Sequence, residues 1–314
     1  MSWHALEEIE EAAKRTRELL LPFDWKLWAK IAVMAFFVGG ASFPGLVPGT
    51  GGAGPEPGQS HGMGFHGDIG QSIGIQSVSD AGFGALALLF VVAVAGLVLV
   101  FGVLKAVFEF VYYQSLIDDN VRIRKNFVEH FTKGLRLFLF EIVSVIIFMI
   151  LFVALIAPIA VSPLFFVATF LLGIPLVIVA VIFFQFTTDF IPLYMIENDQ
   201  GVIASWRQLY NAIIDEWRQL GLYLVVKIAL GLMAQIAIGT AALLLGLLLI
   251  IPVGVPVFIL YLVFPPLAIV AGLIGFVAWI LGILYFLNGP ATTFFRYYSL
   301  LVYNDITQVE EVEK

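Results

Sequence analysis

A few charged residues stand close to the ends of long apolar stretches in this chain, where their chemistry could matter most. They are Lys30, Lys105, Glu109, Glu141, Asp189, Lys227 and Arg296. Charged groups inside a membrane are costly unless they are paired, so such a set is a candidate proton or substrate relay. We expect Glu141 to pair with Lys227. The alternative, which we favour, is structural ion pairing and snorkelling of the side chains toward water.

Two further polar residues, Gln185 and Gln235, lie deeper in the apolar stretches. A glutamine at that depth can hydrogen-bond across helices, at about 1 kcal/mol, or contact a substrate. We favour the first role.

Small residues recur at alternating spacings of three and four near the end of the chain. They are Ala268, Ala271, Gly275, Ala278 and Gly282. This spacing places them on one helical face, where small side chains let another helix approach closely. We favour a neighbour in the same chain over a second protomer, and both stay open.

A glycine-rich segment contains the residue types of a metal site. His61, Met63, His66 and Asp68 are its possible ligands, and imidazole suits zinc, copper or nickel. Their spacing does not match HExxH, and the glycines match neither a dinucleotide fingerprint nor a P-loop. We therefore favour a flexible, solvated loop, and we expect neither a metal nor a cofactor.

The sequence offers no recognisable catalytic group. It contains no cysteine, so a thiol nucleophile and thiolate metal ligands are excluded. An intramembrane hydrolase would need an Asp pair, a Ser–His pair or HExxH at depth, and none is visible. We expect a protein that is not an enzyme.

Composition assigns the chain to a membrane. Of its 314 residues, 61% are hydrophobic and 12% are charged, and the mean hydropathy is +1.01. Soluble domains carry about 25% charged residues, so a soluble globule is excluded. The net charge of −7 provides no basic surface for nucleic acid.

Uncharged intervals predict the membrane spans. Intervals of 24, 47 and 68 residues follow Asp80, Glu141 and Lys227, and one crossing takes about 20 residues. The last interval is about 20 residues longer than two crossings need, and its excess, the proline-rich segment 252–266, could be interfacial or partly re-entrant. The six predicted spans are about 27–43, 83–104, 137–157, 164–186, 222–250 and 267–287.

The distribution of basic residues predicts the orientation. The loops at about 44–82, 158–163 and 252–266 contain no Lys or Arg. Because basic residues favour the cytoplasmic side, we expect both termini in the cytoplasm of a cell whose plasma membrane holds the protein.

The pattern also indicates three tandem units, 1–118, 119–199 and 200–314. Each unit ends in an aromatic segment with a tyrosine, at Tyr113, Tyr194 or Tyr298, followed by acidic or amide residues. Amphipathic segments at 4–21, 121–134 and 200–219 precede the outgoing spans. The stripe of the last segment consists of Ile203, Trp206, Tyr210, Ile213, Trp217 and Leu220. The sequence thus predicts an all-α polytopic helix bundle with six transmembrane helices in three pseudo-repeats and amphipathic helices at the cytoplasmic interface.

Two short motifs carry a resemblance. They are Arg296-Tyr297-Tyr298-Ser299-Leu300, and Glu197-Asn198-Asp199-Gln200-Gly201-Val202 leading to Ser205-Trp206. Around them the chain resembles a superfamily of six-helix membrane proteins, which includes the membrane domain of some glycerophosphodiester phosphodiesterases and multi-pass archaeal and bacterial relatives. The phosphodiester chemistry of those enzymes belongs to a separate soluble barrel. The resemblance therefore implies a membrane module and transfers no catalytic residue.

Two functions are consistent with these observations. The first is a non-enzymatic membrane module that acts as a scaffold, a lipid-organising protein or a subunit of a complex. Its partners would be membrane lipids and a protein, or a second copy, bound through the amphipathic helices. The alternative is a secondary transporter with a cavity lined by Gln185, Gln235, Glu141 and segment 252–266.

Overall fold

The structure is a computed structural model that describes residues 4–39, 80–160, 162 and 165–312. These residues form helices and turns without a strand, which confirms the all-α class. The helices are α1 (His4–Leu20), α2 (Trp25–Val38), α4 (Asp80–Ile117), α5 (Ile123–Ile156), α6 (Phe165–Asp189), α7 (Ile191–Glu197), α8 (Val202–Asp215), α9 (Trp217–Leu249), α10 (Val255–Val263), α11 (Pro265–Ile283) and α12 (Gly289–Val312), with short 3₁₀ or π segments η1 (Ala157–Ala160), η2 (Ile250–Gly254) and η3 (Leu284–Asn288).

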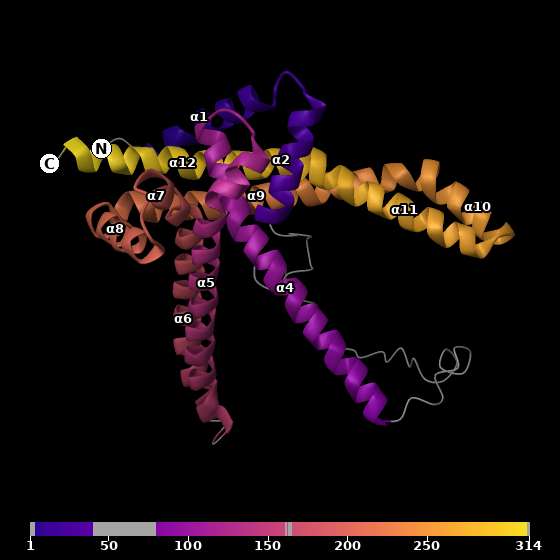
Figure 1. Ribbon diagram of the computed structural model, residues 1–314, viewed down its shortest axis with the longest axis horizontal. Coiled ribbons are helices and arrows are strands. Elements are labelled where there is room, and N and C mark those ends of the chain that lie inside the picture. The colour runs from indigo at the N-terminus through magenta and orange to yellow at the C-terminus, as the bar shows by residue number, and fades with distance from the viewer. Residues whose placement is uncertain (1–3, 40–79, 161, 163–164, 313–314) are drawn as a thin grey trace.

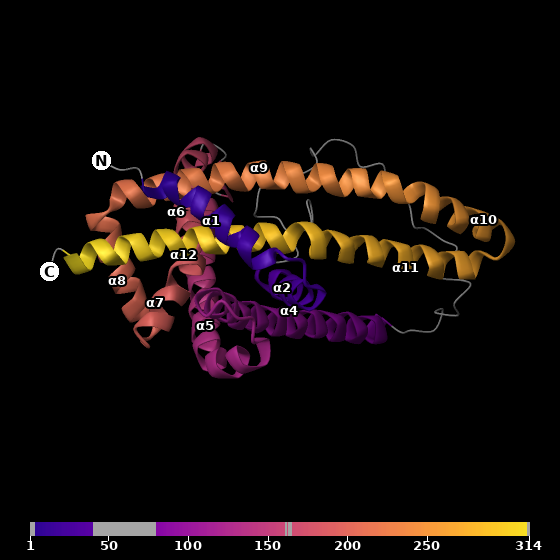
Figure 2. The same cartoon turned by 90° about the horizontal axis from the view of Figure 1, so that it is seen from above.

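Three apolar arms diverge from one packed hub (Figure 1). The first arm is the amino-terminal part of α4, the second is the α5–α6 hairpin, and the third is the hairpin in which α9–η2–α10 runs outward and α11–η3–α12 returns. Figure 2 shows the third arm from above, with α1 lying across α12. The arms expose most of their large apolar side chains, as expected for surfaces that face lipid.

The hub contains the core of the molecule. Its buried side chains come from α1, α2, α4–α9 and α12, and its largest include Tyr112, Tyr113, Tyr223 and Tyr298. The hub forms where the helices leave their purely apolar stretches and become aromatic and charged. The charged residues of the chain are therefore positioned by helix ends that meet one another.

Five helical segments of the described residues are long and apolar enough to cross a membrane. They are Leu88–Ile117, Ile123–Ile159, Thr169–Glu197, Trp217–Val263 and Pro265–Thr307. The prediction of six is wrong for this part of the chain, because the described part of the first predicted span, 27–39, contains only the short helix α2. Helix α2 has 14 residues and a length of about 21 Å, short of a hydrocarbon core of about 30 Å.

The amphipathic segments differ from one another. Segments 4–21 and 200–219 contain the separate helices α1 and α8, but segment 121–134 belongs to α5, which continues from Ile123 into the span. In α8 the buried residues are Val202, Ser205, Leu209 and Ala212. The predicted stripe is divided: Ile203 is 79% exposed and Tyr210 is 59% exposed, whereas Trp206 and Ile213 are half-buried against the core. Leu220, the last residue of the stripe, is buried in α9.

The proline-rich segment 252–266 forms the tip of the third arm. Helix α9 continues through the π turn η2 into α10, and the chain reverses at Phe264, whose φ and ψ are −147° and 85°. Pro265 and Pro266 stand at the start of α11, where a missing N–H removes no helical bond, and Pro252 and Pro256 lie within and just after the π turn.

Gly275 of the small-residue stripe contacts this tip within the chain. A Cβ added at Gly275 would lie 2.7 Å from Val253 Cγ1, whereas one at Gly282 would meet nothing within 4 Å. Ala268 is buried and Ala278 is exposed. Near the tip, therefore, the stripe serves packing inside the chain.

We expect Gly275→Leu to destabilise the third arm by about 1–3 kcal/mol through overpacking. Gly282→Leu is the matched control, and it should leave the thermal midpoint in detergent unchanged. Size-exclusion chromatography would report the oligomeric state of both variants. An unchanged midpoint with an altered oligomeric state for Gly275→Leu would instead place a second chain against the stripe.

Turns that follow two returning helices share an uncommon conformation. Asp119 and Asp199 have positive φ angles of 48° and 46°, which non-glycine residues rarely adopt. Lys133 Nζ lies 2.7 Å from Asp199 Oδ1 and donates to Met195 O at 3.0 Å. The hydrogen bond from Lys133 to the Asp199 carboxylate holds the pKa of Asp199 below its ordinary value. Together the two contacts of Lys133 attach the second turn to α5.

Candidate functional site: a buried charge network

Asp189, at the end of α6, is the centre of one half of the network. Lys227 Nζ of α9 lies 2.5 Å from Asp189 Oδ2. The same oxygen accepts hydrogen bonds from Tyr223 OH at 2.9 Å and from Gln185 Nε2 at 2.5 Å. Lys227 also donates to Tyr223 OH at 3.0 Å and to Ser299 Oγ of α12 at 3.2 Å. The carboxylate and its cation are thus enclosed by polar partners.

Glu109 of α4 is the centre of the other half. Its Oε1 lies 3.7 Å from Lys105 Nζ, one helical turn earlier, and Lys105 Nζ lies 3.9 Å from Glu141 Oε2 of α5. The Glu109 side chain has no exposed area, and neither of its oxygens accepts a hydrogen bond in the described residues. This half is held by charge attraction over longer distances than the first.

Arg296 of α12 joins the two halves. Its Nη1 donates to Tyr113 OH at 2.9 Å and to Thr188 O at 3.0 Å. Its nitrogens lie 3.6 Å from both Glu109 Oε1 and Asp189 Oδ1. A guanidinium can serve this many partners because it carries five N–H donors in a planar fork.

The network is electrically balanced. Three cations, Lys105, Lys227 and Arg296, face three carboxylates, Glu109, Glu141 and Asp189. Burial is deepest at Glu109 and Asp189 and decreases toward Lys105, whose side chain is 38% exposed. Such balance is needed because an unpaired charge in this environment costs several kcal/mol.

Six of the seven charged residues selected from the sequence therefore lie together. Lys30 does not, because its Nζ donates to Val121 O at 3.0 Å, in a cavity outside the network. The expected Glu141–Lys227 pair is not formed: Lys227 binds Asp189, and Glu141 faces Lys105. Gln185 joins the network, whereas Gln235 lies exposed on α9.

The sequence reasoning missed Tyr223 and Ser299, and it noted Tyr113 only as a repeated feature. Helical spacing contains a signal for two of them. Tyr223 lies four residues before Lys227, and Ser299 lies three residues after Arg296, so each shares a helix face with a charged residue of the network.

The arrangement offers paired charges but no metal site. In the described part of the chain, no group of three or more His, Asp or Glu side chains could hold a metal ion. The loop candidates His61, Met63, His66 and Asp68 lie outside the described residues.

Comparison with known proteins adds one result. A model of a family of unknown function, DUF7544, matches residues 3–309. The chain belongs to this family. Neither the curated proteins nor the solved structures include a match. Because the match to DUF7544 extends from α1 into α12, it covers the hub and all three arms.

The geometry predicts unequal roles for two carboxylates of this DUF7544 member. We expect Glu141→Gln to lower the free energy of unfolding by less than about 1 kcal/mol, because the contact of Glu141 with the half-exposed Lys105 spans 3.9 Å and Lys105 retains Glu109. Asp189→Asn should cost about 2 kcal/mol, because it weakens a charge-assisted cluster. Denaturation by SDS in mixed micelles would measure both variants, and a larger loss for Glu141→Gln would contradict this ranking.

Proposed function

We propose that the protein is a non-enzymatic integral membrane module that acts as a scaffold or as a subunit of a membrane complex. The observation that carries this proposal is that the buried charged groups pair with one another. Each of the six charges has an oppositely charged neighbour within the hub, and the set is neutral. Groups engaged in this way hold helices together.

The position of Arg296 supports a structural role. It contacts α4 through Tyr113 and Glu109, and α6 through Thr188 and Asp189. Lys227 brings α9 to the same carboxylate. Replacing a buried ion pair by apolar residues often costs little, so such pairs are weak evidence for stability. In this protein the ion pairs fix the relative positions of the hub ends of the three arms.

The exposed face of α8 supports a role in binding a partner or the membrane surface. Ile203 and Tyr210 are exposed, and so is Ile214 at 55%. Trp217, which is 63% exposed, begins the next helix, α9. Aromatic and aliphatic side chains on one helical face are typical of an interface with headgroups or with another protein. We propose that this face is the surface through which the module engages its partner.

The membrane topology is part of the same proposal. We infer that the hub lies on the cytoplasmic side of the plasma membrane with both termini, since the basic residues gather there. We also infer that the chain derives from tandem units. The left-handed turns at Asp119 and Asp199, 80 positions apart, support this inference for the first two units.

A transporter is the second candidate, and one observation favours it. Glu109 is fully buried, yet neither of its carboxylate oxygens accepts a hydrogen bond in the described residues. A carboxylate with free acceptor sites inside a membrane protein can bind and release a proton.

The test asks whether the protein forms a complex with a partner or carries protons across a membrane. The chain is purified in mild detergent with native lipid, and its complexes are weighed by native mass spectrometry. We expect a stoichiometric complex that Ile203→Gln/Tyr210→Gln weakens and that Val128→Gln, at another exposed apolar position, leaves intact. A chain without any partner, whose proteoliposomes carry a proton flux that Glu109→Gln abolishes, would instead establish the transporter.

A further inference from the structure

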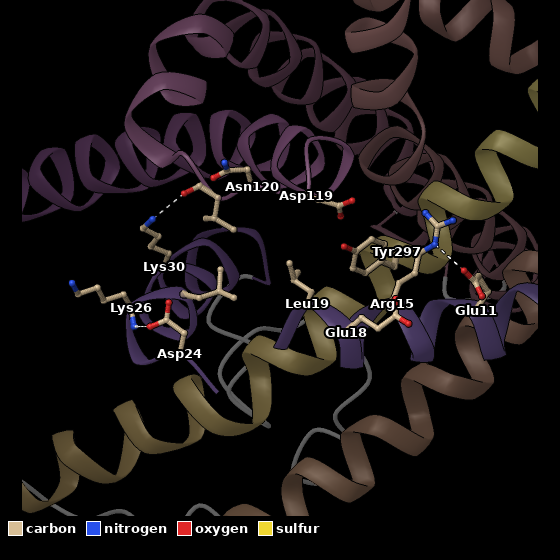
Figure 3. Close-up of a pocket in the computed structure, with 12 residues that line it drawn as sticks. Glu11, Arg15, Glu18, Leu19, Asp24, Lys26, Lys30, Asp119, Asn120 and Tyr297 are labelled. Carbon is tan, nitrogen blue, oxygen red and sulfur yellow. Dashed lines mark hydrogen bonds and ion pairs between the residues drawn. The ribbon is translucent and has the colours of Figure 1, made fainter. Parts of the chain in front are cut away.

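A cavity of about 820 Å³ lies outside the charge network. It opens between α1, α2 and the turn that connects α4 to α5 (Figure 3). Its lining is dominated by charged side chains, and Tyr297 is the single aromatic residue that lines it in the described part of the chain.

The end of the cavity beside α2 has two cations, Lys26 and Lys30, and one carboxylate, Asp24, which caps the helix. Lys26 and Lys30 are one helical turn apart and lie toward the same side of the cavity (Figure 3). Lys30 is fixed by its hydrogen bond to Val121 O. The ammonium group of Lys26 has no hydrogen-bond or ion-pair partner among the described residues, since only its backbone N–H is bonded, to Asp24.

The anionic end is formed by α1 and by the turn. Glu18 and Asp119 lie on the side of the cavity away from the two lysines (Figure 3). Glu18 makes neither a hydrogen bond nor an ion pair with the described residues, while Asp119 interacts with the Tyr297 hydroxyl. Arg15 also lines this end of the cavity, and its guanidinium is engaged by Glu11 at 3.0 Å.

The two ends together suit a ligand that carries both charges. Two lysine ammonium groups match a phosphate, because cations form strong charge-assisted hydrogen bonds with its oxygens. Two carboxylates match a primary ammonium group, which donates three hydrogen bonds. A quaternary ammonium group donates none and is usually held by several aromatic rings, whereas Tyr297 is the one ring here.

A cluster of aromatic side chains beside the cavity indicates where this ligand comes from. The rings of Trp25 and Tyr285 pack in a tilted arrangement with their centroids 4.6 Å apart, and the rings of Phe23 and Trp28 are 5.1 Å apart. The Tyr285 hydroxyl donates to Trp25 O at 2.8 Å. Exposed Trp and Tyr side chains concentrate at the boundary between membrane and water. The cavity therefore lies at the depth of phospholipid headgroups.

We propose that this cavity binds the headgroup of a zwitterionic phospholipid with a primary ammonium group, of the phosphoethanolamine type. Lys26 and Lys30 hold the phosphate, and Glu18 and Asp119 accept hydrogen bonds from the ammonium group. The site shares none of its residues with the charge network, so its failure would leave the scaffold proposal standing.

Native mass spectrometry of the full chain, titrated with phosphatidylethanolamine, phosphatidylcholine or phosphatidylglycerol, tests the assignment. We expect phosphatidylethanolamine to bind most tightly. Lys26→Gln should weaken phosphatidylethanolamine and phosphatidylcholine alike, by about fivefold, since both carry the phosphate. Glu18→Gln should weaken phosphatidylethanolamine alone by a similar factor and so reduce the preference between the two.

Matched controls remove the same charges elsewhere. Lys125→Gln and Glu129→Gln alter exposed positions of α5 that do not line the cavity, and they should change no affinity. The side chains of Lys26 and Glu18 have no hydrogen-bond or ion-pair partner to lose within the described part of the chain, so both variants should fold as the native chain does. Equal binding of phosphatidylglycerol, or equal losses in the controls, would overturn the proposal.

A soluble headgroup compound distinguishes a membrane phospholipid from a free metabolite as the ligand of this cavity. Glycerophosphoethanolamine carries the same charges without acyl chains. We expect it to bind at least tenfold more weakly than the lipid in nanodiscs, because the neighbouring aromatic cluster contacts only a membrane-bound ligand. Equal affinity would assign the cavity to a free metabolite and would overturn the lipid source.

Discussion

Replacing Arg296 with methionine should lower the free energy of unfolding by about 3–5 kcal/mol, the typical cost of removing one member of a buried ionic cluster. Arg296 is the cation that contacts both Glu109 and Asp189. Without it, the network has three carboxylates and two cations. Glu109 would keep Lys105 at 3.7 Å as its remaining cation, with no hydrogen bond to its oxygens.

Unfolding in mixed micelles and the folded yield in detergent would measure this loss. Arg136→Met removes the same charge from an exposed position of α5 and should cost less than about 0.5 kcal/mol. Arg296→Lys should be intermediate, because an ammonium group cannot reach Tyr113, Thr188 and both carboxylates together.

A double-mutant cycle would separate the lost charge from lost packing. In Arg296→Met/Glu109→Gln the remaining network has two cations and two carboxylates, so part of the loss should be recovered. If the double variant is as unstable as the sum of the single variants, Arg296 acts through its packing, and the electrostatic account of the hub is incorrect.

Gly134→Ala should cost about 3 kcal/mol, the upper end of the range for overpacking. Gly134 lies where α5 crosses α4. A Cβ there would be 2.6 Å from Val107 Cγ2, 2.7 Å from Val107 Cα and 2.9 Å from Val107 N. Two of these atoms belong to the backbone, so the contact is relieved only by moving one helix away from the other.

Two other glycines provide the comparison. A Cβ added at Gly231 of α9 would have no atom within 4 Å. Gly231→Ala should therefore stabilise the helix by up to about 1 kcal/mol. Gly102→Ala would contact the Phe138 ring, a side chain that can turn, so its cost should be smaller than that of Gly134→Ala. Unfolding midpoints in one detergent would rank the three variants, and equal midpoints for Gly134→Ala and Gly231→Ala would contradict the close approach of α4 and α5.

The sequence predicted helix class and the grouping of charge well, because both depend on composition along single helices. Five of the six charged residues of the network border the long uncharged stretches, and Glu109 lies one helical turn beyond Lys105. The ends that carry them meet in the hub. The choice of partners was not predictable. Whether Lys227 faces Glu141 or Asp189 depends on the rotation and crossing of α5, α6 and α9, which periodicity within one helix does not determine.

The first span shows a second limit. Segment 27–43 is apolar enough to suggest a crossing, but α2 ends at Val38, where the N–H of Gly39 bonds Ala35 O. The hydropathy of a segment does not determine the residue at which its helix ends. The position of Lys30 in the sequence resembles that of the buried charges, because it too lies near the start of an apolar segment. In the fold, however, α2 directs Lys30 to the cavity beside α1.

The length of the third arm has a consequence for the membrane itself. Residues 228–263 contain no charge, and as a helix these 36 residues measure about 54 Å, against a hydrocarbon core of about 30 Å. A straight apolar rod of this length would fit within the core at a tilt of roughly 55°, far more than the average span, and a kink or a local thickening of the bilayer would reduce the tilt that it needs. A thicker bilayer would allow a steeper rod. Because α9 enters the hub at Tyr223 and Lys227, a change in the tilt of this arm would act on the helix that carries Lys227.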